Sequence, residues 1–137
     1  MLAQVMHMDI KSDGRGNLVA LEGERSVPFA IKRVYYLTEV SGHQRGFHAH
    51  RNLHQLAICL HGSCRFVLDN GYERESVYLD NPAKGLFIDN LIWREMHDFS
   101  DDCVLMVLAS DYYDEADYIR NYDVFLEEVK NSSNKSE

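Results

Sequence analysis

The stretch RGFHAHRNLHQLAICLHGSCRFVLDNGYERESVYL, residues 45–79, decides the fold. It holds short runs rich in β-branched and aromatic residues that are separated by turn signals, a pattern typical of β-strands. Asn70-Gly71 favours a type I′ hairpin turn because both residues accept positive φ values. His61-Gly62 marks a second tight turn. The stretch therefore predicts antiparallel strands joined by short turns.

Runs of the same kind lie on both sides of this stretch. The expected strands are 18–21, 31–40, 46–49, 53–60, 64–68, 75–79, 85–88 and 104–109. So many closely spaced strands predict an all-β fold, an antiparallel sandwich or barrel. After Ser110 the apolar period lengthens, and Tyr118, Tyr122, Phe125 and Val129 predict one amphipathic helix.

The acidic residues Asp111, Asp114, Glu115 and Asp117 are expected near the start of this helix, where carboxylates cap free amide groups. Residues 131–137, NSSNKSE, are expected to form a flexible polar tail. Residues 1–130 then make a single domain, since no linker or internal repeat interrupts them.

Composition narrows the class of protein. The chain has 137 residues, 14 Lys+Arg, 22 Asp+Glu and a formal net charge of −8. This balance argues against nucleic acid as a partner, and no apolar run approaches the roughly 18 residues of a membrane helix. No signal peptide is recognisable, and the three cysteines form no CxxC pair. We therefore expect a cytoplasmic protein with reduced thiols and no membrane association.

The most informative motif is Gly46-Phe47-His48-Ala49-His50. In an extended strand, residues two apart face the same side, so His48 and His50 are expected to share one cavity wall. An HxH pair serves either as metal ligands or as an acid/base pair, and spacing alone does not separate the two.

The pattern resembles the first motif of the cupin superfamily, a glycine followed by HxH and a later glycine. Pro82, Gly85 and His97 approximate the second motif. His54 stands where metal-binding cupins usually place a glutamate, so His48, His50, His54 and His97 are the ligand set of one alternative, a metal-dependent cupin oxygenase. A non-catalytic module that binds a nucleotide sugar is a further alternative.

A closer resemblance covers nearly the whole chain. The segments that carry it are DGRGNLVALE (13–22), PFAIKRVYYL (28–37), RGFHAH (45–50), HGSCRFVLDNG (61–71), WREMHDFS (93–100) and VLASDYYDEADYIRNYD (107–123). They look like the sugar 3,4-ketoisomerases, which act on dTDP-4-keto-6-deoxyglucose in the synthesis of 3-amino-3,6-dideoxyhexoses. The resemblance implies a cupin jelly-roll barrel with a C-terminal helix, a homodimer with exchanged strands, and neither metal nor cofactor. It favours a product of galacto configuration.

The resemblance also implies roles for individual residues. His48 is the expected base at carbon 3, with His50 as proton shuttle, Tyr35 as a phenol near the sugar and Arg15 as a cation for a phosphate or keto oxygen. The expected substrate-binding residues are Lys32, Arg33, Arg45, Arg65, Arg94, Trp93 and His97. Strand alternation requires that Lys32 and Arg33 face opposite sides.

Overall fold

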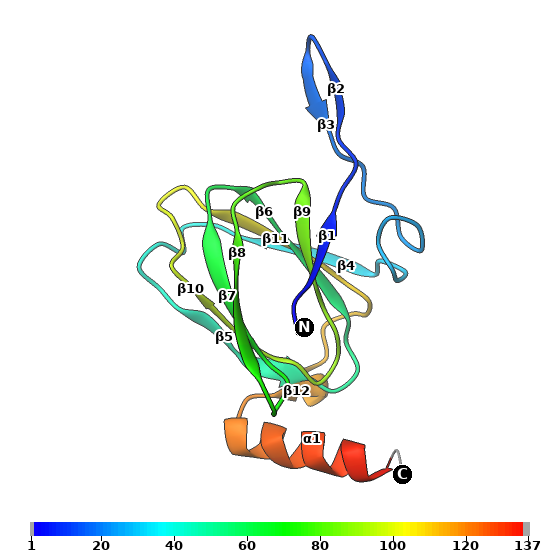
Figure 1. Ribbon diagram of the computed structural model, residues 1–137, viewed down its shortest axis with the longest axis vertical. Coiled ribbons are helices and arrows are strands. Elements are labelled where there is room, and N and C mark those ends of the chain that lie inside the picture. Colours follow the sequence, from blue (N-terminus) through cyan, green and yellow to red (C-terminus); the bar gives the residue numbers. More distant parts are fainter. Residues whose placement is uncertain (1, 136–137) are drawn as a thin grey trace.

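Two facing antiparallel sheets make up most of the computed structural model, which describes residues 2–135 (Figure 1). One sheet has the strand order β1-β9-β6-β11-β4, and the other has the order β12-β5-β10-β7-β8. The strands of the first sheet are β1 (Gln4–His7), β4 (Arg33–Leu37), β6 (Gln55–His61), β9 (Lys84–Ile88) and β11 (Val104–Ala109). Those of the second are β5 (Arg45–His50), β7 (Cys64–Asp69), β8 (Arg74–Leu79), β10 (Trp93–His97) and β12 (Tyr118–Ile119). The expected all-β antiparallel architecture is confirmed.

The positions of the strands differ from the sequence prediction mainly near the N-terminus. The strand expected at 18–21 is shifted, because β3 (Gly16–Leu18) pairs with β2 (Lys11–Asp13) in a hairpin, while Val19 and Leu21 pack on the outer face of the first sheet. The hairpin forms an arm that projects away from the sandwich (Figure 1). The pairing of β1, β10 and β12 was not predicted.

The turn between β7 and β8 confirms the hairpin but corrects its type. Four residues separate Asp69 from Arg74, and Gly71 has a φ of 93° whereas Asn70 does not have a positive φ. The Asn70 side chain accepts the backbone N–H groups of Tyr72 and Glu73, at 2.9 Å each. Because this side chain stabilises a wider loop, the type I′ geometry expected for Asn-Gly does not form.

The C-terminal helix begins later than expected. Helix α1 spans Tyr122–Lys135, and Asn121 caps it by accepting the N–H of Val124 at 3.1 Å. Glu115 and Asp117 of the acidic run instead lie in a short 3₁₀ helix, η1 (Glu115–Asp117), and Asp114 caps the start of this helix. Residues 118–119 leave the helical path because they pair with β5 as strand β12. The backbone of residues 131–135, which we expected in a flexible tail, continues α1, and residues 136–137 lie outside the described part.

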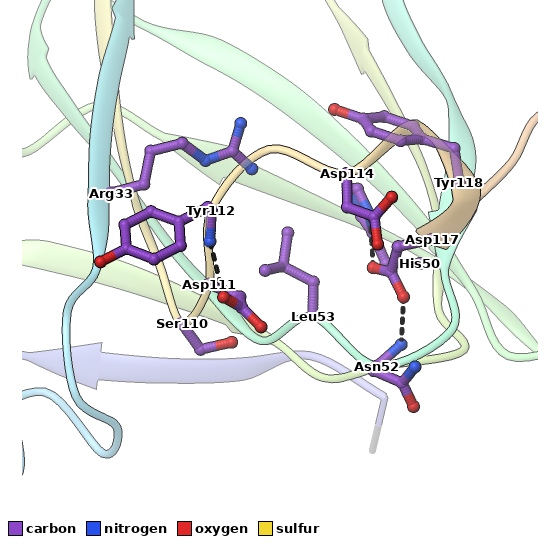
Figure 2. A pocket seen from close by; sticks show the side chains of 10 residues that line it. All are labelled: Arg33, His50, Asn52, Leu53, Ser110, Asp111, Tyr112, Asp114, Asp117 and Tyr118. Atoms are coloured by element: carbon purple, nitrogen blue, oxygen red, sulfur yellow. Dashed lines mark hydrogen bonds and ion pairs between the residues drawn. The ribbon is translucent and has the colours of Figure 1, made fainter.

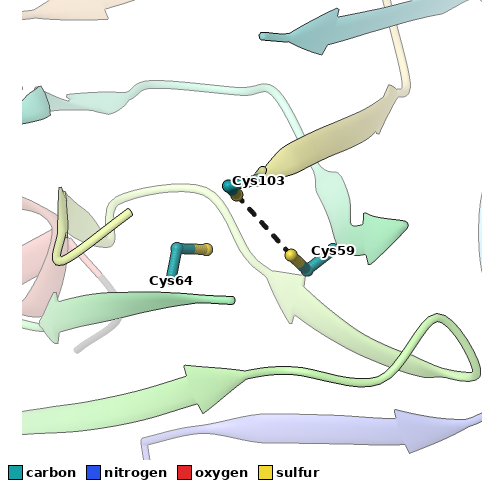
Figure 3. Close-up of side chains that lie close together, drawn as sticks. All are labelled: Cys59, Cys64 and Cys103. Atoms are coloured by element: carbon teal, nitrogen blue, oxygen red, sulfur yellow. Dashed lines mark hydrogen bonds between the residues drawn. The ribbon is translucent and has the colours of Figure 1, made fainter. Parts of the chain in front are cut away.

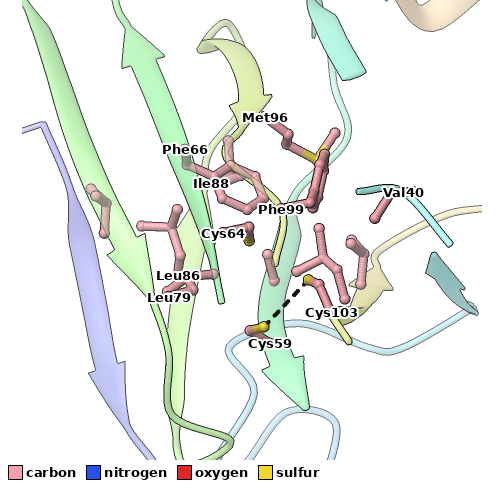
Figure 4. Packing of buried hydrophobic residues seen from close by; sticks show 14 of the residues in the cluster. Val40, Cys59, Cys64, Phe66, Leu79, Leu86, Ile88, Met96, Phe99 and Cys103 are labelled. Carbon is pink, nitrogen blue, oxygen red and sulfur yellow. Dashed lines mark hydrogen bonds between the residues drawn. The ribbon is translucent and has the colours of Figure 1, made fainter. Parts of the chain in front are cut away.

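Three apolar clusters hold these layers together. The largest fills the space between the sheets, and Figure 4 shows its packing around Phe66, Leu86 and Ile88. A second covers the outer face of the first sheet, and a third packs α1 through Phe125 and Val129 against the second sheet. Burial of these side chains is the main stabilising contribution to the fold. In residues 2–135 no helix has both the length and the apolar character that a membrane span requires.

Candidate active site

A cavity of about 500 Å³ lies between β4, β5 and the segment that leads into β12. This volume falls in the range of about 300 to 1,000 Å³ that small-molecule sites occupy. Its lining combines aromatic, cationic and imidazole groups: Arg33, Tyr35, Leu37, Gln44, Arg45, Gly46, His48, Met96, Tyr113, Tyr118 and Arg120. The cavity therefore offers both cations for an anionic ligand and groups that exchange protons.

The HxH motif places two imidazoles side by side, as its alternation predicts. The ring centroids of His48 and His50 are 5.0 Å apart, and both rings contact Tyr118. Phe47 points away from them and Ala49 packs beneath α1. The two imidazoles nevertheless line different cavities. His48 lines the cavity of about 500 Å³, and His50 lines a smaller cavity of about 110 Å³. The expectation of one shared wall is corrected to two adjoining cavities.

Both histidines carry a buried nitrogen without a hydrogen-bond partner in the described residues. These atoms are Nδ1 of His48 and Nε2 of His50. Most buried polar atoms in proteins are paired, so an unpaired ring nitrogen beside a cavity marks a place for a ligand or a transferable proton.

Burial and the nearby Arg94 cation lower the pKa of His48 to about 3. The same two causes lower the pKa of His50 to about 2. Both imidazoles are therefore neutral at pH 7, and each ring has one nitrogen lone pair that can accept a proton.

Asp117 determines the orientation of His50. Its Oδ2 atom lies 3.2 Å from Nδ1 of His50, and its Oδ1 atom accepts the backbone N–H of Asn52 at 2.8 Å (Figure 2). A neutral imidazole next to a carboxylate donates through Nδ1–H, which leaves Nε2 as the acceptor nitrogen. Sequence reasoning missed this role, because Asp117 was assigned to helix capping and lies 67 residues from His50.

A second chain of hydrogen bonds reaches the cavity through Tyr35. The Tyr35 hydroxyl accepts a hydrogen bond of 3.0 Å from Nε2 of Gln55, and Oε1 of Gln55 accepts one from Arg94. Burial raises the pKa of Tyr35, so its hydroxyl is protonated at pH 7. Tyr36 is exposed, as strand alternation predicts.

Three arginines line the cavity, and one of them, Arg120, is paired with Glu115 at 2.8 Å. The Arg33 guanidinium lies 5.3 Å from the ring centroid of Tyr35, and its buried Nε has no hydrogen-bond partner in the described residues. Arg45 lines the same cavity. Arg120, which sequence reasoning missed, lies 4.2 Å from the ring centroid of Tyr118. The sequence prediction placed Arg120 within the C-terminal helix and therefore assigned it no role in binding.

The structure places three other predicted cations outside this cavity. Lys32, which immediately precedes β4, is exposed and lies 3.9 Å from Asp111, while Arg33 lines the cavity as alternation requires. Arg65 pairs with Asp98 at 2.8 Å on the outer face of the second sheet. Arg94 is 2% exposed and lies behind Tyr35 and His48, where no diphosphate can reach it. Its pKa is lowered to about 10 by burial, so it remains a cation at pH 7.

Trp93 and His97 are also corrected in position, whereas the role of Arg15 stays a prediction. Trp93 is buried between the second sheet and α1, where it contacts Phe125, so it does not face a ligand. His97 pairs with Glu95 at 3.0 Å, away from the cavity. Arg15 lies on the projecting arm, paired with Asp13, and does not approach His48 within one chain.

The four-histidine metal site is not assembled. His54 stacks on Phe87 and its Nδ1 lies 2.8 Å from Asp89, while His97 pairs with Glu95. In residues 2–135 these two imidazoles do not join His48 and His50 in any group of three or more metal-ligating side chains. The donor set of the oxygenase alternative is therefore absent from the cavity.

The lowered pKa values predict a loss of stability in acid. In the unfolded chain a histidine has a pKa near 6.5, so below this pH the unfolded state binds protons that His48 and His50 do not bind when folded. The free energy of unfolding should fall by up to about 1.4 kcal/mol per pH unit for each histidine between pH 6.5 and 4.5. Urea denaturation across this range measures the slope.

Replacing His48 with asparagine should reduce this slope, and the matched change at exposed His43 should leave it unaltered. An equal slope in the His48→Asn variant and in the wild type would contradict the buried neutral state.

A two-sheet antiparallel sandwich, with neutral imidazoles beside a cationic cavity, defines a cupin-like protein equipped for acid/base chemistry on an anionic ligand. The family described as "FdtA: WxcM-like, C-terminal" matches residues 1–130, and the chain belongs to this family.

Similar proteins agree with this assignment. The TDP-4-oxo-6-deoxy-alpha-D-glucose-3,4-oxoisomerase of Aneurinibacillus thermoaerophilus is 58% identical over 114 residues, which are 82% of each chain. A mutant of the 3,4-ketoisomerase QdtA from Thermoanaerobacterium thermosaccharolyticum, solved in complex with TDP-4-keto-6-deoxyglucose, is 46% identical with a TM-score of 0.91 over 95% of each chain. The TDP-quinovose 3,4-ketoisomerase WlaRB from Campylobacter jejuni is 47% identical with a TM-score of 0.89, over 91% of this chain and 97% of its own.

Proposed function

We propose that this protein moves the keto group of dTDP-4-keto-6-deoxyglucose from carbon 4 to carbon 3. The observation that carries the proposal is the neutral His48 imidazole, with a buried Nδ1 that has no hydrogen-bond partner in the described residues, beside a cavity lined by three arginines. Relatives named as 3,4-ketoisomerases of TDP sugars support it. The reaction exchanges the oxidation states of two neighbouring carbons of one molecule, so it consumes no redox cofactor.

His48 acts as the base in this mechanism. Its neutral imidazole removes the proton from carbon 3, and the electron pair of that C–H bond forms an enediolate across carbons 3 and 4. The hydroxyl of Tyr35 and the nearby cationic groups stabilise the developing oxygen charge. A proton then returns to carbon 4, and one proton passes between the two oxygens, so that the ketone lies at carbon 3.

His50 completes the relay. Its ring contacts that of His48, and Asp117 holds its Nδ1–H, which leaves Nε2 able to accept and return a proton. The small cavity beside His50 has room for water but not for a nucleotide sugar. We assign His50 to proton exchange with solvent and with His48 rather than to direct contact with carbon 3.

The diphosphate of the substrate is held by the arginines of the large cavity. Arg33 and Arg45, both predicted to bind substrate, line this cavity, and Arg120, which is paired with Glu115, adds a third guanidinium. Planar guanidinium groups pair with phosphate oxygens through two parallel hydrogen bonds, so they suit a diphosphate better than point charges do.

Nuclear magnetic resonance in deuterated buffer tests this function. Incubation with dTDP-4-keto-6-deoxyglucose should yield a 3-keto sugar that carries deuterium at carbon 4, because the proton added there comes from a group that exchanges with solvent. Tight binding with recovery of unchanged 4-keto sugar would instead leave only a nucleotide-sugar binding module.

The configuration at carbon 4 that we propose is galacto. Its support is the sequence resemblance, since the geometry of the cavity does not distinguish the two faces of the ring. The coupling constants of the carbon 4 proton, measured on product made in ordinary water, separate an axial from an equatorial hydrogen. A gluco product would overturn this assignment and leave the ketone transfer intact.

We propose a homodimer with exchanged arms, in which the β2–β3 hairpin of one chain completes the cavity of the other. Arg15 lies in the turn between β2 and β3, on the arm that projects from the sandwich (Figure 1), and does not line the large cavity of its own chain. Strand β4 is an edge strand whose outer residues Val34 and Tyr36 are exposed. An unpaired, apolar sheet edge is expected to be covered. The free cysteines agree with a reducing compartment, and we propose the cytoplasm.

Mixing two inactive variants tests the exchange. Arg15→Ala and His48→Asn homodimers should each show little turnover, whereas a mixed dimer has one cavity with both native residues. Activity should therefore recover to about a quarter of the wild-type value after co-refolding of equal amounts, since half of the dimers are mixed and each has one intact site of two. The absence of recovery would place Arg15 and His48 in the same chain's site or outside catalysis.

A further inference from the structure

Three cysteine side chains converge inside the sandwich, far from the imidazoles. Cys59 lies on β6, Cys64 begins β7 and Cys103 immediately precedes β11. Their Sγ atoms all lie within 4.8 Å of one another, and those of Cys59 and Cys103 are 3.6 Å apart (Figure 3). Three thiols from three different segments are thus brought to one point.

This cluster is separate from the active site. Gln55, which contacts Tyr35, begins β6, whereas Cys59 lies four residues further along the same strand. The three cysteines belong to the core between the sheets (Figure 4), and none is more than 3% exposed. None of them lines the large cavity or the cavity of His50.

The spacing of the sulfurs suits a single metal ion. Three sulfurs bound in a plane at about 2.3 Å from one ion are separated by about 4.0 Å. The 3.6 Å between the sulfurs of Cys59 and Cys103 is about 0.4 Å short of this value, and no two sulfurs of the cluster are more than 4.8 Å apart. Binding therefore requires only small shifts of the sulfurs.

The donor set also selects the type of metal. Zinc in structural sites takes four ligands. In residues 2–135 the cluster contains three sulfurs and no imidazole or carboxylate. Thiolate ligands prefer soft ions such as Cu(I), which accepts low coordination numbers.

We propose that Cys59, Cys64 and Cys103 form a three-thiolate site that binds one Cu(I) ion. Binding forms three Cu–S bonds and releases the thiol protons to the buffer, with no change in oxidation state. The turn of Gly62 separates Cys59 from Cys64 along the chain and lies against the loop that contains Ser100 and Asp102.

Anaerobic titration of the reduced full-length protein tests the site. Cu(I) supplied as its bicinchoninate complex should transfer to the protein in a ratio of one ion per chain, with loss of the chelator's colour. X-ray absorption on the loaded protein should show three sulfur neighbours at about 2.3 Å. Nitrogen or oxygen neighbours in place of the three sulfurs would overturn the proposal. Because this measurement uses the wild-type protein, it does not depend on whether a variant folds.

Substitutions provide the second arm of the test. Cys59→Ala, Cys64→Ala and Cys103→Ala should each weaken Cu(I) binding by more than the roughly 10- to 100-fold that loss of an outer-shell partner costs. Val77→Ala is the matched control, because it truncates a side chain of the same core without removing a sulfur. This variant should bind Cu(I) as tightly as the wild type does, which would show that loss of core packing does not explain the weaker binding of the cysteine variants. Failure of the wild type to take Cu(I) from the chelator, full binding by Cys59→Ala, or tighter binding of Zn²⁺ would overturn the assignment.

Discussion

Replacing His48 with asparagine is expected to lower kcat by a factor of about 10² to 10⁴, which is the usual contribution of a positioned general base. The asparagine side chain cannot accept the carbon 3 proton at neutral pH. The fold should survive, because Nδ1 of His48 makes no side-chain hydrogen bond in the described residues, and the backbone group beside the ring is that of Gly46 on the same strand. Steady-state kinetics together with the thermal transition measure both effects.

The matched control is His43→Asn, which changes an exposed imidazole in the loop before β5 and should retain full activity. In deuterated buffer the His48→Asn variant should also fail to exchange the carbon 3 hydrogen of the substrate. Turnover near the wild-type rate would remove His48 from the role of base and transfer it to His50.

Replacing Asp117 with asparagine is expected to reduce kcat by about 10²-fold or more, through the tautomer of His50. The new amide keeps an oxygen for the N–H of Asn52 and presents its NH₂ group to Nδ1 of His50. Nδ1 then becomes the acceptor and Nε2 carries the proton, which reverses the arrangement that the relay requires. KM should change much less than kcat, because Asp117 does not line the large cavity.

Nitrogen chemical shifts of His50 provide a readout that a purely structural role would not move. They should report a proton on Nδ1 in the wild type and on Nε2 in the Asp117→Asn variant. Asp114→Asn is the matched control, because Asp114 lines the same small cavity but caps η1, a role that asparagine also performs. An unchanged tautomer with reduced kcat would show that Asp117 acts by holding the 51–52 loop.

Much of the site was predictable because strand geometry is local. The two-residue period placed His48 beside His50, separated Lys32 from Arg33 and directed Tyr35 inward while Tyr36 faced solvent. The resemblance across the chain identified the chemistry from the same segments. Neither the use of strand alternation nor the recognition of the resemblance required knowledge of which strands pair.

Predictions failed where the answer depended on segments far apart in the chain. Arg94, Trp93 and His97 lie on one strand, β10, where Trp93 and His97 both contact the Glu95 carboxylate on one face and Arg94 points to the other. Arg94 is buried beneath the cavity, Trp93 is covered by α1, and His97 faces Glu95. The sequence indicated charge and aromaticity there, but not which layer would cover the strand.

The residue pattern predicted the β-class and the close pair of imidazoles, and the resemblance implied the kind of reaction. Three features followed only from the packing of the sheets: Asp117 holds His50, Arg120 joins Arg33 and Arg45, and three thiols meet in the core. Alternation along a strand was predictable because it follows from backbone sterics over a few residues. Contacts between residues 44 or 67 positions apart, such as those of Cys59 with Cys103 and of His50 with Asp117, arise only when the sheets pack and exclude water from between them.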